Sequence, residues 1–531
     1  MCGIAVAIDW DGADQIVPQL LAGISHRGDI TDPVVSPRVN TAMGTRRLRI
    51  VDWARAVQPQ SSFDGKLLVA FNGEIYNHRE LREQLMAKGV SFRTESDTEV
   101  LANALQVWGV KALAMLNGMF AFVALDVSTG EFLAARDPFG VKPLYVIQYQ
   151  QGFLFCSEIR PLLRATDVGD VLLIPPGYVL TRKICAGYKT AIGEAPGRTS
   201  AADIPTLDRL LSDAVRARLP DDLPVAINLS GGIDSTLVAH YAHRERSDAV
   251  GFFLGAEDSP DFRYVDEYAR RSGIALRIVP FSPDSSETLA RIGEVVAASE
   301  AFEPALIRGA LCSYVLSEAI HREGYRVALC GEGADELFAG YVPIEWGYFK
   351  GPEDGRWIRE QCIAQMHSSV LQRVDRCSMR FAVETREPFL DPRVAAYALG
   401  LGRDSLIDIV RGKPRGKKCL RALYDLYPQA LPRAIRDRTK VLFDEGAGLD
   451  LGRPNSAWRA LFENAISDKE LRDGCHEYEP YGIRTKEELF YIRILAANMD
   501  ISRVPHLRAR LYLHLPDGVE KAMQETGALG L

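Results

Sequence analysis

The second residue of this 531-residue chain is a cysteine, in the opening sequence Met1-Cys2-Gly3. Removal of the initiator methionine would place a thiol and an α-amino group on this one residue. An α-amino group has an unperturbed pKa of about 7.7–8.0, so near neutral pH part of it can accept the thiol proton. Cys2 is therefore a candidate nucleophile that carries its own base. The alternative is a buried, inert cysteine at the start of the apolar segment 4–8.

A series of polar motifs follows this cysteine within the first 150 residues. They are His26-Arg27-Gly28, Arg47-Leu48-Arg49-Ile50-Val51-Asp52, Gln58-Pro59, Phe71-Asn72-Gly73-Glu74-Ile75-Tyr76-Asn77, Ser96-Asp97-Thr98-Glu99, Met119-Phe120-Ala121-Phe122 and Arg136-Asp137-Pro138-Phe139-Gly140-Val141-Lys142-Pro143-Leu144-Tyr145. In order and spacing they resemble the glutaminase half of class II glutamine amidotransferases. That family usually continues His-Arg-Gly with Pro-Asp, whereas this chain has Asp29-Ile30, which leaves the geometry of that loop open.

The resemblance implies a role for each matched polar residue. Arg47 would bind the carboxylate of glutamine through its guanidinium fork, and Glu74 and Asp97 would face the ammonium group. The Asn72 side chain and the Gly73 backbone N–H would form an oxyanion hole, because both are donors that can be aimed at the charge developing on the amide oxygen. Asn-Gly is also a strong signal for a tight turn between strands, an interpretation compatible with an oxyanion hole.

The second half of the chain contains a predicted phosphate site. Residues 225–229 form a short apolar run, and Ser230-Gly231-Gly232-Ile233-Asp234-Ser235 leads from it into a helical pattern. A strand, a glycine-rich turn and a helix N-terminus together form an anion site. The sequence lacks the motifs of a Walker loop and of a dinucleotide fold. It resembles the pyrophosphate loop of N-type ATP pyrophosphatases, which split ATP into AMP and pyrophosphate while adenylating a substrate.

A second apolar run, residues 327–330, leads into Gly331-Glu332-Gly333-Ala334-Asp335-Glu336. Such acidic clusters at the C-terminal edge of a parallel sheet lie on its usual ligand side. Mg²⁺ binds through one or two carboxylates plus phosphates, and the resemblance assigns Asp234 and Asp335 to this ion. The alternative is an acidic helix start, favoured by the helix dipole. The resemblance also implies that ATP is bound by Leu229, Ser230, Gly231, Gly232, Asp234, Ser235, Leu254, Gly331 and Glu332.

The two halves together resemble the glutamine-hydrolysing asparagine synthetase family over nearly the full chain. Further matches are Arg308, Val374-Asp375-Arg376-Cys377-Ser378-Met379, Glu384-Thr385-Arg386-Glu387-Pro388-Phe389-Leu390-Asp391, Lys417-Lys418-Cys419-Leu420-Arg421, Thr485-Lys486-Glu487-Glu488, Tyr491 and Arg493. The family assignment implies that Lys417 neutralises phosphate charge as an acyl-adenylate forms. The alternative for Lys417 is a solvated basic face, because other basic residues lie close to it in the sequence.

The residue type at position 332 distinguishes two groups of enzymes within this family. Relatives that close a β-lactam ring carry a tyrosine at this position, whereas a carboxylate can take the proton that attacking ammonia must lose. Glu332 is therefore expected to act as a catalytic base, with aspartate as the expected acceptor. The family's threonines before Ile-Arg are replaced by Pro304-Ala305-Leu306, which keeps a different carboxylic acid open. An ammonia-fed ligase and a non-catalytic metabolite-binding homologue are the remaining alternatives.

The pattern of apolar segments predicts two domains of different class. Residues 1–190 alternate short β-rich runs with a few amphipathic helices, and we expect an α+β domain with stacked antiparallel sheets between helices. The resemblance implies that this is an N-terminal nucleophile hydrolase domain. Residues 191–206 are rich in Gly, Pro and Ser and are the expected linker. Residues 207–531 alternate apolar strands with longer helices, which is typical of an α/β parallel-sheet domain, and the resemblance implies that it is of the ATP pyrophosphatase type.

The amino-acid composition limits the binding partners and the cellular location that we expect for this chain. A net charge of −7 argues against nucleic acid as a main partner, and no apolar stretch approaches the roughly 18 residues of a membrane span. The nine cysteines are scattered without a Cys-x-x-Cys pair, which favours a reducing compartment and a cytoplasmic location. The expected ligands are glutamine, ATP, Mg²⁺ and a carboxylate acceptor, and a homodimer is a candidate assembly.

Overall fold

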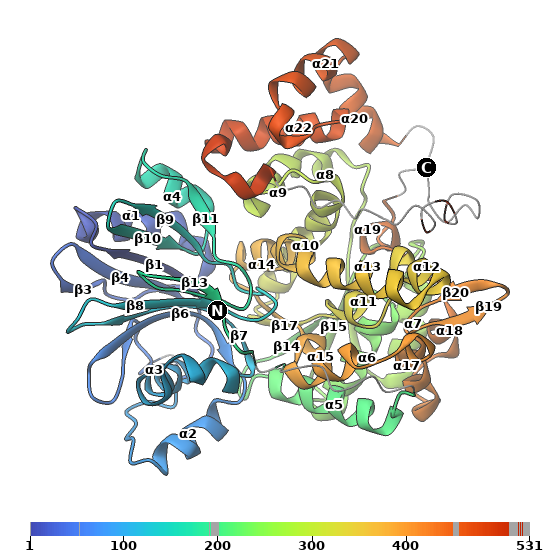
Figure 1. Cartoon of the computed structure of the whole chain (residues 1–531). Coiled ribbons are helices and arrows are strands. Elements are labelled where there is room, and N and C mark those ends of the chain that lie inside the picture. Colours follow the sequence, from blue (N-terminus) through green and yellow to red (C-terminus); the bar gives the residue numbers. More distant parts are fainter. Residues whose placement is uncertain are drawn as a thin grey trace.

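A computed structural model describes residues 2–52, 54–190, 192, 201–449, 456–508, 519, 521 and 523. Two antiparallel sheets stack in the N-terminal part, the blue to teal region of Figure 1. The first has the order β11-β9-β10-β1-β4-β2, with β3 also on β4: β1 (Cys2–Ile8), β2 (Ile30–Thr31), β3 (Val35–Arg38), β4 (Thr41–Arg47), β9 (Tyr145–Tyr149), β10 (Gly152–Cys156) and β11 (Val171–Leu173). The second has the order β13-β12-β8-β7-β6-β5: β5 (Gln60–Ser61), β6 (Leu67–Ile75), β7 (Gly118–Asp126), β8 (Phe132–Arg136), β12 (Tyr178–Leu180) and β13 (Cys185–Gly187).

Strand β1 shows how the sequence builds this sandwich. Successive side chains of a strand point to opposite faces, so Ile4, Val6 and Ile8 pack between the two sheets. The smaller Ala5 and Ala7 face the opposite way, toward α1 (Ala13–Gly23) and α4 (Ile159–Ala165). On the far side of the second sheet lie α2 (His78–Met86) and α3 (Asp97–Trp108). The expected α+β arrangement of stacked antiparallel sheets between helices is confirmed.

A five-stranded parallel sheet forms the core of the second part, in the order β16-β15-β14-β17-β18. Its strands are β14 (Val225–Asn228), β15 (Val250–Leu254), β16 (Ala275–Val279), β17 (Val327–Leu329) and β18 (Glu384–Arg386). The chain places β15 and β16 on one side of β14 and then returns to place β17 on the other side. The strand order therefore reverses between β14 and β17, which is where open α/β sheets bind ligands. The expected α/β parallel-sheet class is confirmed.

Helices cover both faces of this sheet and build a cap of helices at the top of Figure 1. Around the sheet are α5 (Ile204–Arg218), α6 (Ile233–Glu245), α7 (Phe262–Ser272), α8 (Ser286–Ala290), α9 (Ile292–Ser299), α10 (Pro304–Arg322), α11 (Ala334–Leu337), α12 (Val342–Lys350), α13 (Pro352–Gln365), α14 (Val370–Met379), α15 (Pro392–Leu399), α16 (Arg403–Leu406), α17 (Lys418–Leu423), α18 (Arg433–Asp437) and α19 (Phe443–Gly446). The cap consists of α20 (Ala457–Ala465), α21 (Asp468–Glu477) and α22 (Lys486–Asn498), and β19 (Asp408–Val410) pairs with β20 (Lys413–Arg415) in a hairpin.

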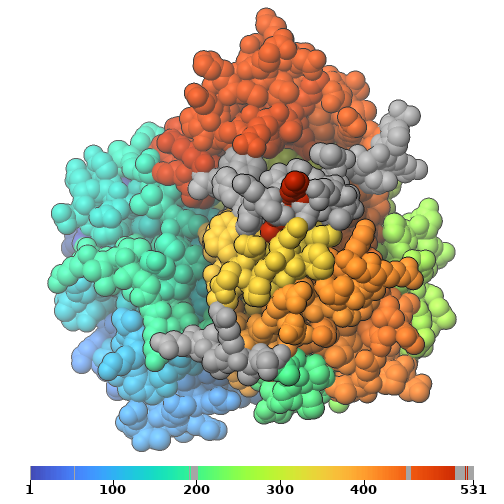
Figure 2. Space-filling model, turned by 45° about the vertical axis from the view of Figure 1, so that its right-hand side comes forward, coloured from blue at the N-terminus to red at the C-terminus, as the bar shows by residue number. Residues whose placement is uncertain are grey.

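The two parts lie against each other, as the ribbon and the space-filling view show (Figures 1 and 2). Strand β13 ends at Gly187, and the next helix, α5, starts at Ile204 with the Asp203 side chain as its N-cap. Of the expected linker 191–206, residues 191 and 193–200 lie outside the described residues. Within the described parts of the chain, we find no helix long and apolar enough to cross a membrane.

Candidate active sites

Cys2 lies at the first position of β1, opposite Arg47 of β4. Its backbone N–H donates to Asn72 Oδ1 at 3.1 Å, and Gln58 Nε2 lies 3.9 Å from its sulfur. Burial raises the pKa of the Cys2 thiol to about 11. Because only the thiolate is strongly nucleophilic, a nucleophilic role for this thiol would need a nearby base, and the α-amino group that removal of Met1 would create is the expected one.

Asp32 holds the predicted carboxylate-binding arginine. Arg47 Nε and Nη2 donate to the two oxygens of Asp32 at 2.7 and 2.9 Å, and the Gln58 backbone N–H donates to the same carboxylate at 3.1 Å. Each of these three residues is at most 6% exposed. Sequence reasoning missed Asp32, because nothing in its local pattern distinguishes it from the neighbouring Asp29.

Asn72 and Gly73 lie inside β6 and pair with β7, so the alternative of a tight turn at these residues is wrong. A Cβ on Gly73 would lie 2.1 Å from Met119 O, and Gly73 φ is +158°, so only glycine fits. Asn72 Nδ2 is buried and has no hydrogen-bond partner among the described residues. An unpartnered buried donor is costly, and here it is available to an oxyanion.

Glu74 and Asp97 form a buried acidic pair beside this strand. Asp97 opens α3 and accepts a hydrogen bond from the Ile75 N–H at 2.9 Å. Burial, followed by repulsion from Asp97, raises the pKa of Glu74 to about 8, and burial also raises the pKa of Asp97 to about 6. A ligand that brings a positive charge would relieve this repulsion, as the ammonium group of an amino acid does.

The second predicted site is a cavity of about 160 Å³ at the reversal point of the parallel sheet. Glycine lets the loops that follow β14 and β17 approach closely, because a Cβ on Gly331 would lie 2.8 Å from the Asp234 Cβ. The residues expected to bind ATP, except Gly231, line this cavity, together with Asp335 and Lys417. Gly231 instead has φ +68° and accepts a hydrogen bond from Arg438 Nη1 at 2.8 Å through its carbonyl oxygen.

Lys417 bridges the two predicted metal-binding carboxylates. Its Nζ lies 2.5 Å from both Asp234 Oδ2 and Asp335 Oδ1, and Lys440 Nζ pairs with Asp335 Oδ2 at 2.7 Å. Burial raises the pKa of Asp335, but the two lysines outweigh it and bring that pKa to about 2. Lys417 is buried, so the alternative of a solvated basic face is wrong for this residue. Lys440 and Arg438 are cations of the cavity that sequence reasoning missed.

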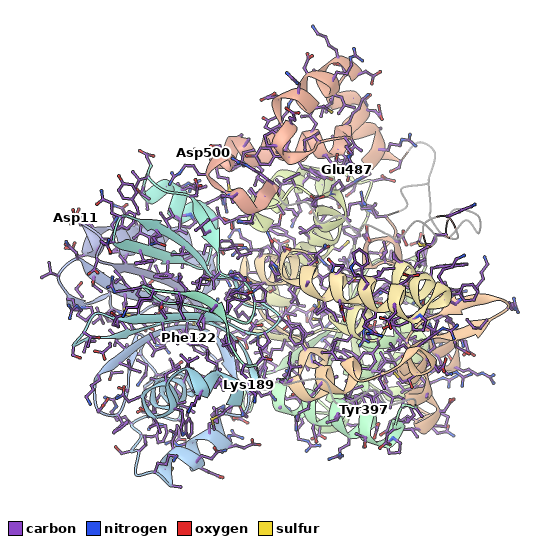
Figure 3. All side chains as sticks on the ribbon, in the orientation of Figure 1. Asp11, Phe122, Lys189, Tyr397, Glu487 and Asp500 are labelled. Carbon is purple, nitrogen blue, oxygen red and sulfur yellow. The ribbon has the colours of Figure 1, made fainter. Side chains whose placement is uncertain are left out.

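Glu332 lines the same cavity and pairs with Arg373 of α14, whose Nη2 lies 2.7 Å from Glu332 Oε1. Ser313 and Leu316 of α10 also reach the cavity. Residues 304–306, where the sequence departs from the family, begin α10 and are not among the cavity-lining residues. Arg308 Nη1 pairs at 3.1 Å with Oε1 of Glu487, which belongs to α22 of the helical cap and is labelled in Figure 3.

The described residues contain no ready-made group of three or more metal-binding side chains. Nevertheless the two aspartates fit Mg²⁺, which needs only one or two protein carboxylates when phosphate supplies the other ligands. Asp234 Oδ1 is buried and makes no hydrogen bond to any described residue, so it is available to a cation.

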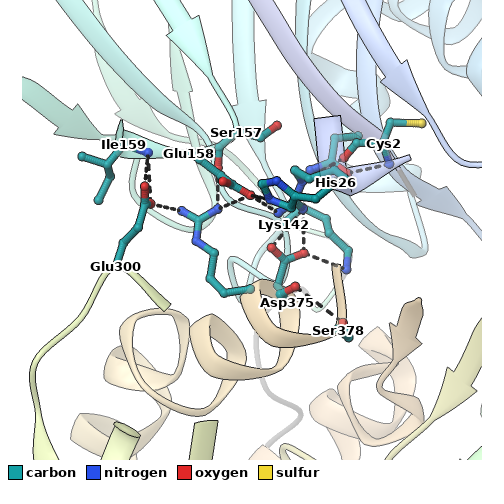
Figure 4. Close-up of polar contacts among 12 residues, drawn as sticks. Cys2, His26, Lys142, Ser157, Glu158, Ile159, Glu300, Asp375 and Ser378 are labelled. Carbon is teal, nitrogen blue, oxygen red and sulfur yellow. Dashed lines mark hydrogen bonds and ion pairs between the residues drawn. The ribbon is translucent and has the colours of Figure 1, made fainter. Parts of the chain in front are cut away.

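A buried polar network joins the two parts next to Cys2 (Figure 4). Arg27 Nε donates to the Cys2 carbonyl oxygen at 3.3 Å, and its two terminal nitrogens pair with Glu158 at 3.1 Å and with Asp375 of α14 at 2.9 Å. Arg27 is fully buried. Helix α14 therefore contacts the backbone of the predicted nucleophile through Arg27, and it contacts Glu332 through Arg373.

Comparison with known proteins agrees with this two-site arrangement. The family model for a glutamine amidotransferase domain matches residues 1–172, and that for asparagine synthase matches residues 206–358 and 345–497. Asparagine synthetase [glutamine-hydrolyzing] 1 from Arabidopsis thaliana is 30% identical and is aligned over 93% of this chain and 86% of its own. The Sandersonia aurantiaca enzyme is 30% identical over 93% of this chain and 95% of its own.

Among solved structures, the glutamine phosphoribosylpyrophosphate amidotransferase from B. subtilis superposes with a TM-score of 0.31 at 19% identity. It covers 55% of this chain and 70% of its own, a likeness too low to carry any argument. The family models and the curated relatives decide the assignment. This chain belongs to the glutamine-hydrolysing asparagine synthetase family, with a glutamine amidotransferase domain followed by an asparagine synthase domain.

Proposed function

We propose that this protein converts the side-chain carboxylate of aspartate into the amide of asparagine, with ammonia from glutamine and with cleavage of ATP to AMP and pyrophosphate. The observation that carries the proposal is the cavity at the parallel sheet. It holds an anion-binding loop, two carboxylates suited to Mg²⁺, the cation of Lys417 and the carboxylate of Glu332. The same chain carries a buried thiol beside an unpartnered amide donor.

Glutamine hydrolysis would begin at Cys2. The α-amino group takes the thiol proton, and the sulfur attacks the side-chain amide carbon of glutamine. Asn72 Nδ2 and the Gly73 N–H stabilise the oxyanion, and the protonated α-amino group returns its proton to the amide nitrogen, which leaves as ammonia. Water then hydrolyses the thioester to glutamate and the free thiol. Arg47, fixed by Asp32, would bind the α-carboxylate.

Adenylation would follow in the second cavity. An oxygen of the acceptor carboxylate attacks the α-phosphorus of ATP, and pyrophosphate leaves. When bound, Mg²⁺ held by Asp234 and Asp335 would neutralise phosphate charge. Lys417, between these carboxylates, would stabilise the charge on the departing pyrophosphate.

Ammonia then attacks the acyl carbon, and Glu332 accepts the proton that the nitrogen loses as AMP departs. In water ammonia is mostly protonated at neutral pH and unreactive, so it must pass between the sites without release. The Arg373 partner holds Glu332 in the cavity.

The test uses glutamine labelled in its amide nitrogen, with ATP, Mg²⁺ and a panel of carboxylic acids that includes aspartate. Mass spectrometry of products should show labelled asparagine and AMP. The Cys2→Ala variant should lose the glutamine-dependent reaction and keep the ammonium-dependent one. If the label appears in the amide of another acid and aspartate does not react, aspartate is not the acceptor. If no acid yields AMP, the proposed synthetase function is wrong.

A further inference from the structure

Arg386 belongs to the asparagine synthase domain, yet its side chain reaches the predicted glutamine site. It lies at the end of β18 and is 2% exposed. Its Nη2 donates to Glu74 Oε2 at 3.2 Å, its Nε donates to Glu384 Oε1 at 2.6 Å, and its Nη1 donates to the Arg218 carbonyl oxygen at 2.8 Å. One buried guanidinium is thus shared between a carboxylate of each domain.

The backbone of the same residue contacts the loop of the second site. Strand β18 pairs in parallel with β17, where Leu329 lies opposite Arg386. The Cys330 N–H donates to the Arg386 carbonyl oxygen at 3.1 Å, and Glu332 follows two residues later. The side chain of Arg386 therefore contacts one candidate site, and its backbone supports the loop of the other.

Arg386 favours the charged form of Glu74. The titratable groups that act on it are Asp97 of α3, His78 at the start of α2, and Glu384 and Arg386 of β18. Burial and the negative charge of Asp97 raise the pKa of Glu74 to about 8 even with Arg386 beside it, and because Arg386 lowers this pKa, its loss would raise the pKa further. A protonated Glu74 would offer a glutamine ammonium group no charge to pair with.

We propose that Arg386 is a positioning residue for glutamine: its guanidinium holds the Glu74 carboxyl group in place to face the ammonium group, so the asparagine synthase domain completes the glutamine site. This inference rests on the proposed function, in which Glu74 binds glutamine. Because the backbone of Arg386 holds the Cys330 amide, a movement of the loop that carries Glu332 would be transmitted to the glutamine site through one residue.

The test compares Arg386→Gln and Arg386→Lys with the wild type in glutamine hydrolysis without ATP. Loss of an opposite charge within about 4–6 Å raises a carboxyl pKa by about one unit or more, so KM for glutamine should rise about tenfold in Arg386→Gln. The pH profile of kcat/KM for glutamine should move to higher pH, and kcat should change far less than KM. Arg386→Lys should restore part of the affinity. Ammonium-dependent synthesis should persist.

Arg393→Gln is the matched control. Arg393 lies seven residues further along, pairs with Asp391, and its side chain is 51% exposed, so KM for glutamine should stay at the wild-type value. A folded Arg386→Gln variant with wild-type KM would overturn the proposal. Equal loss of both activities with an unshifted pH profile would also overturn it, because that pattern indicates a purely structural role.

If Arg386→Gln does not fold, Arg386→Lys decides the question. A raised KM with a shifted profile supports the proposal, and wild-type values contradict it. Failure of the proposed function would look different, because the wild-type protein itself would then not hydrolyse glutamine.

Discussion

Glu300 of the asparagine synthase domain caps a helix of the amidotransferase domain, and its replacement by alanine should open that helix. The carboxylate accepts hydrogen bonds from the Ile159 N–H at 3.0 Å and the Arg160 N–H at 2.8 Å, at the start of α4. It also pairs with Arg376 of α14 at 3.0 Å. Glu300 and Arg376 are both buried, and Figure 4 shows the contacts to Glu300.

The expected magnitude follows from this burial. Removing one partner of a buried ion pair costs about 3–5 kcal/mol, and loss of a helix cap costs about 1 kcal/mol. Arg376 keeps a hydrogen bond to the Ser157 carbonyl oxygen at 2.8 Å, so we expect the lower end, about 3 kcal/mol. That corresponds to roughly hundredfold faster exchange of the Ile159 and Arg160 amides.

Hydrogen–deuterium exchange with mass spectrometry measures this directly on the peptide that contains Ile159 and Arg160. Glu323→Ala is the control, because Glu323 pairs with Arg277 on the surface and such pairs contribute about 0–1 kcal/mol. In the Glu300→Ala, Arg376→Met double variant, the loss of free energy that protects these amides should be smaller than the sum of the losses in the two single variants. If this peptide in Glu300→Ala exchanges at a rate within about threefold of the wild-type rate, Glu300 is not the interdomain cap.

Three further outcomes follow from the structure. Lys417→Met should abolish AMP formation and leave glutamine hydrolysis intact, and unchanged pyrophosphate release would contradict the role of Lys417. Gly73→Ala should abolish glutamine hydrolysis and spare ammonium-dependent synthesis, because the added Cβ would lie 2.1 Å from the Met119 carbonyl oxygen; glutaminase activity at the wild-type level would refute this. Burial raises the pKa of Asp391, but Arg218 and other partners outweigh it and bring that pKa to about 2, below the usual 3.8. This carboxylate therefore stabilises the fold by about 2 kcal/mol above pH 4, and the contribution is lost as the pH falls from about 4 to 2; urea unfolding of Asp391→Asn should show a flatter dependence in that window, and a dependence as steep as that of the wild type would count against it.

The fold classes were predictable because the two halves have different apolar patterns. In β1 every residue is apolar, since both faces of this strand are buried. The sequence therefore indicated a strand but could not show that Ile4, Val6 and Ile8 face the second sheet. The parallel sheet was predictable from residues 225–229 and 327–330, where apolar runs end at glycine-rich loops.

The local motifs of the candidate sites could be read from the sequence, but their long-range partners could not. Asp234 and Lys417 are 183 residues apart, and Arg386 and Glu74 are 312 apart. Such pairs depend on how strands and domains dock, which no local spacing encodes. The interpretation of Asn72-Gly73 as a turn was wrong for a related reason. Both residues pair with strand β7 as part of β6, and this tertiary pairing overrides the local turn preference.

Transfer of ¹⁸O from the acceptor to the nucleotide distinguishes activation of the carboxylate as an acyl-adenylate from activation as an acyl phosphate. Aspartate labelled with ¹⁸O in its side-chain carboxylate is incubated with the wild-type protein, ATP, Mg²⁺ and glutamine, and the nucleotide products are analysed by mass spectrometry. An acyl-adenylate yields AMP that carries one ¹⁸O and pyrophosphate that carries none. Unlabelled AMP, or ADP with labelled phosphate, would contradict activation as an acyl-adenylate.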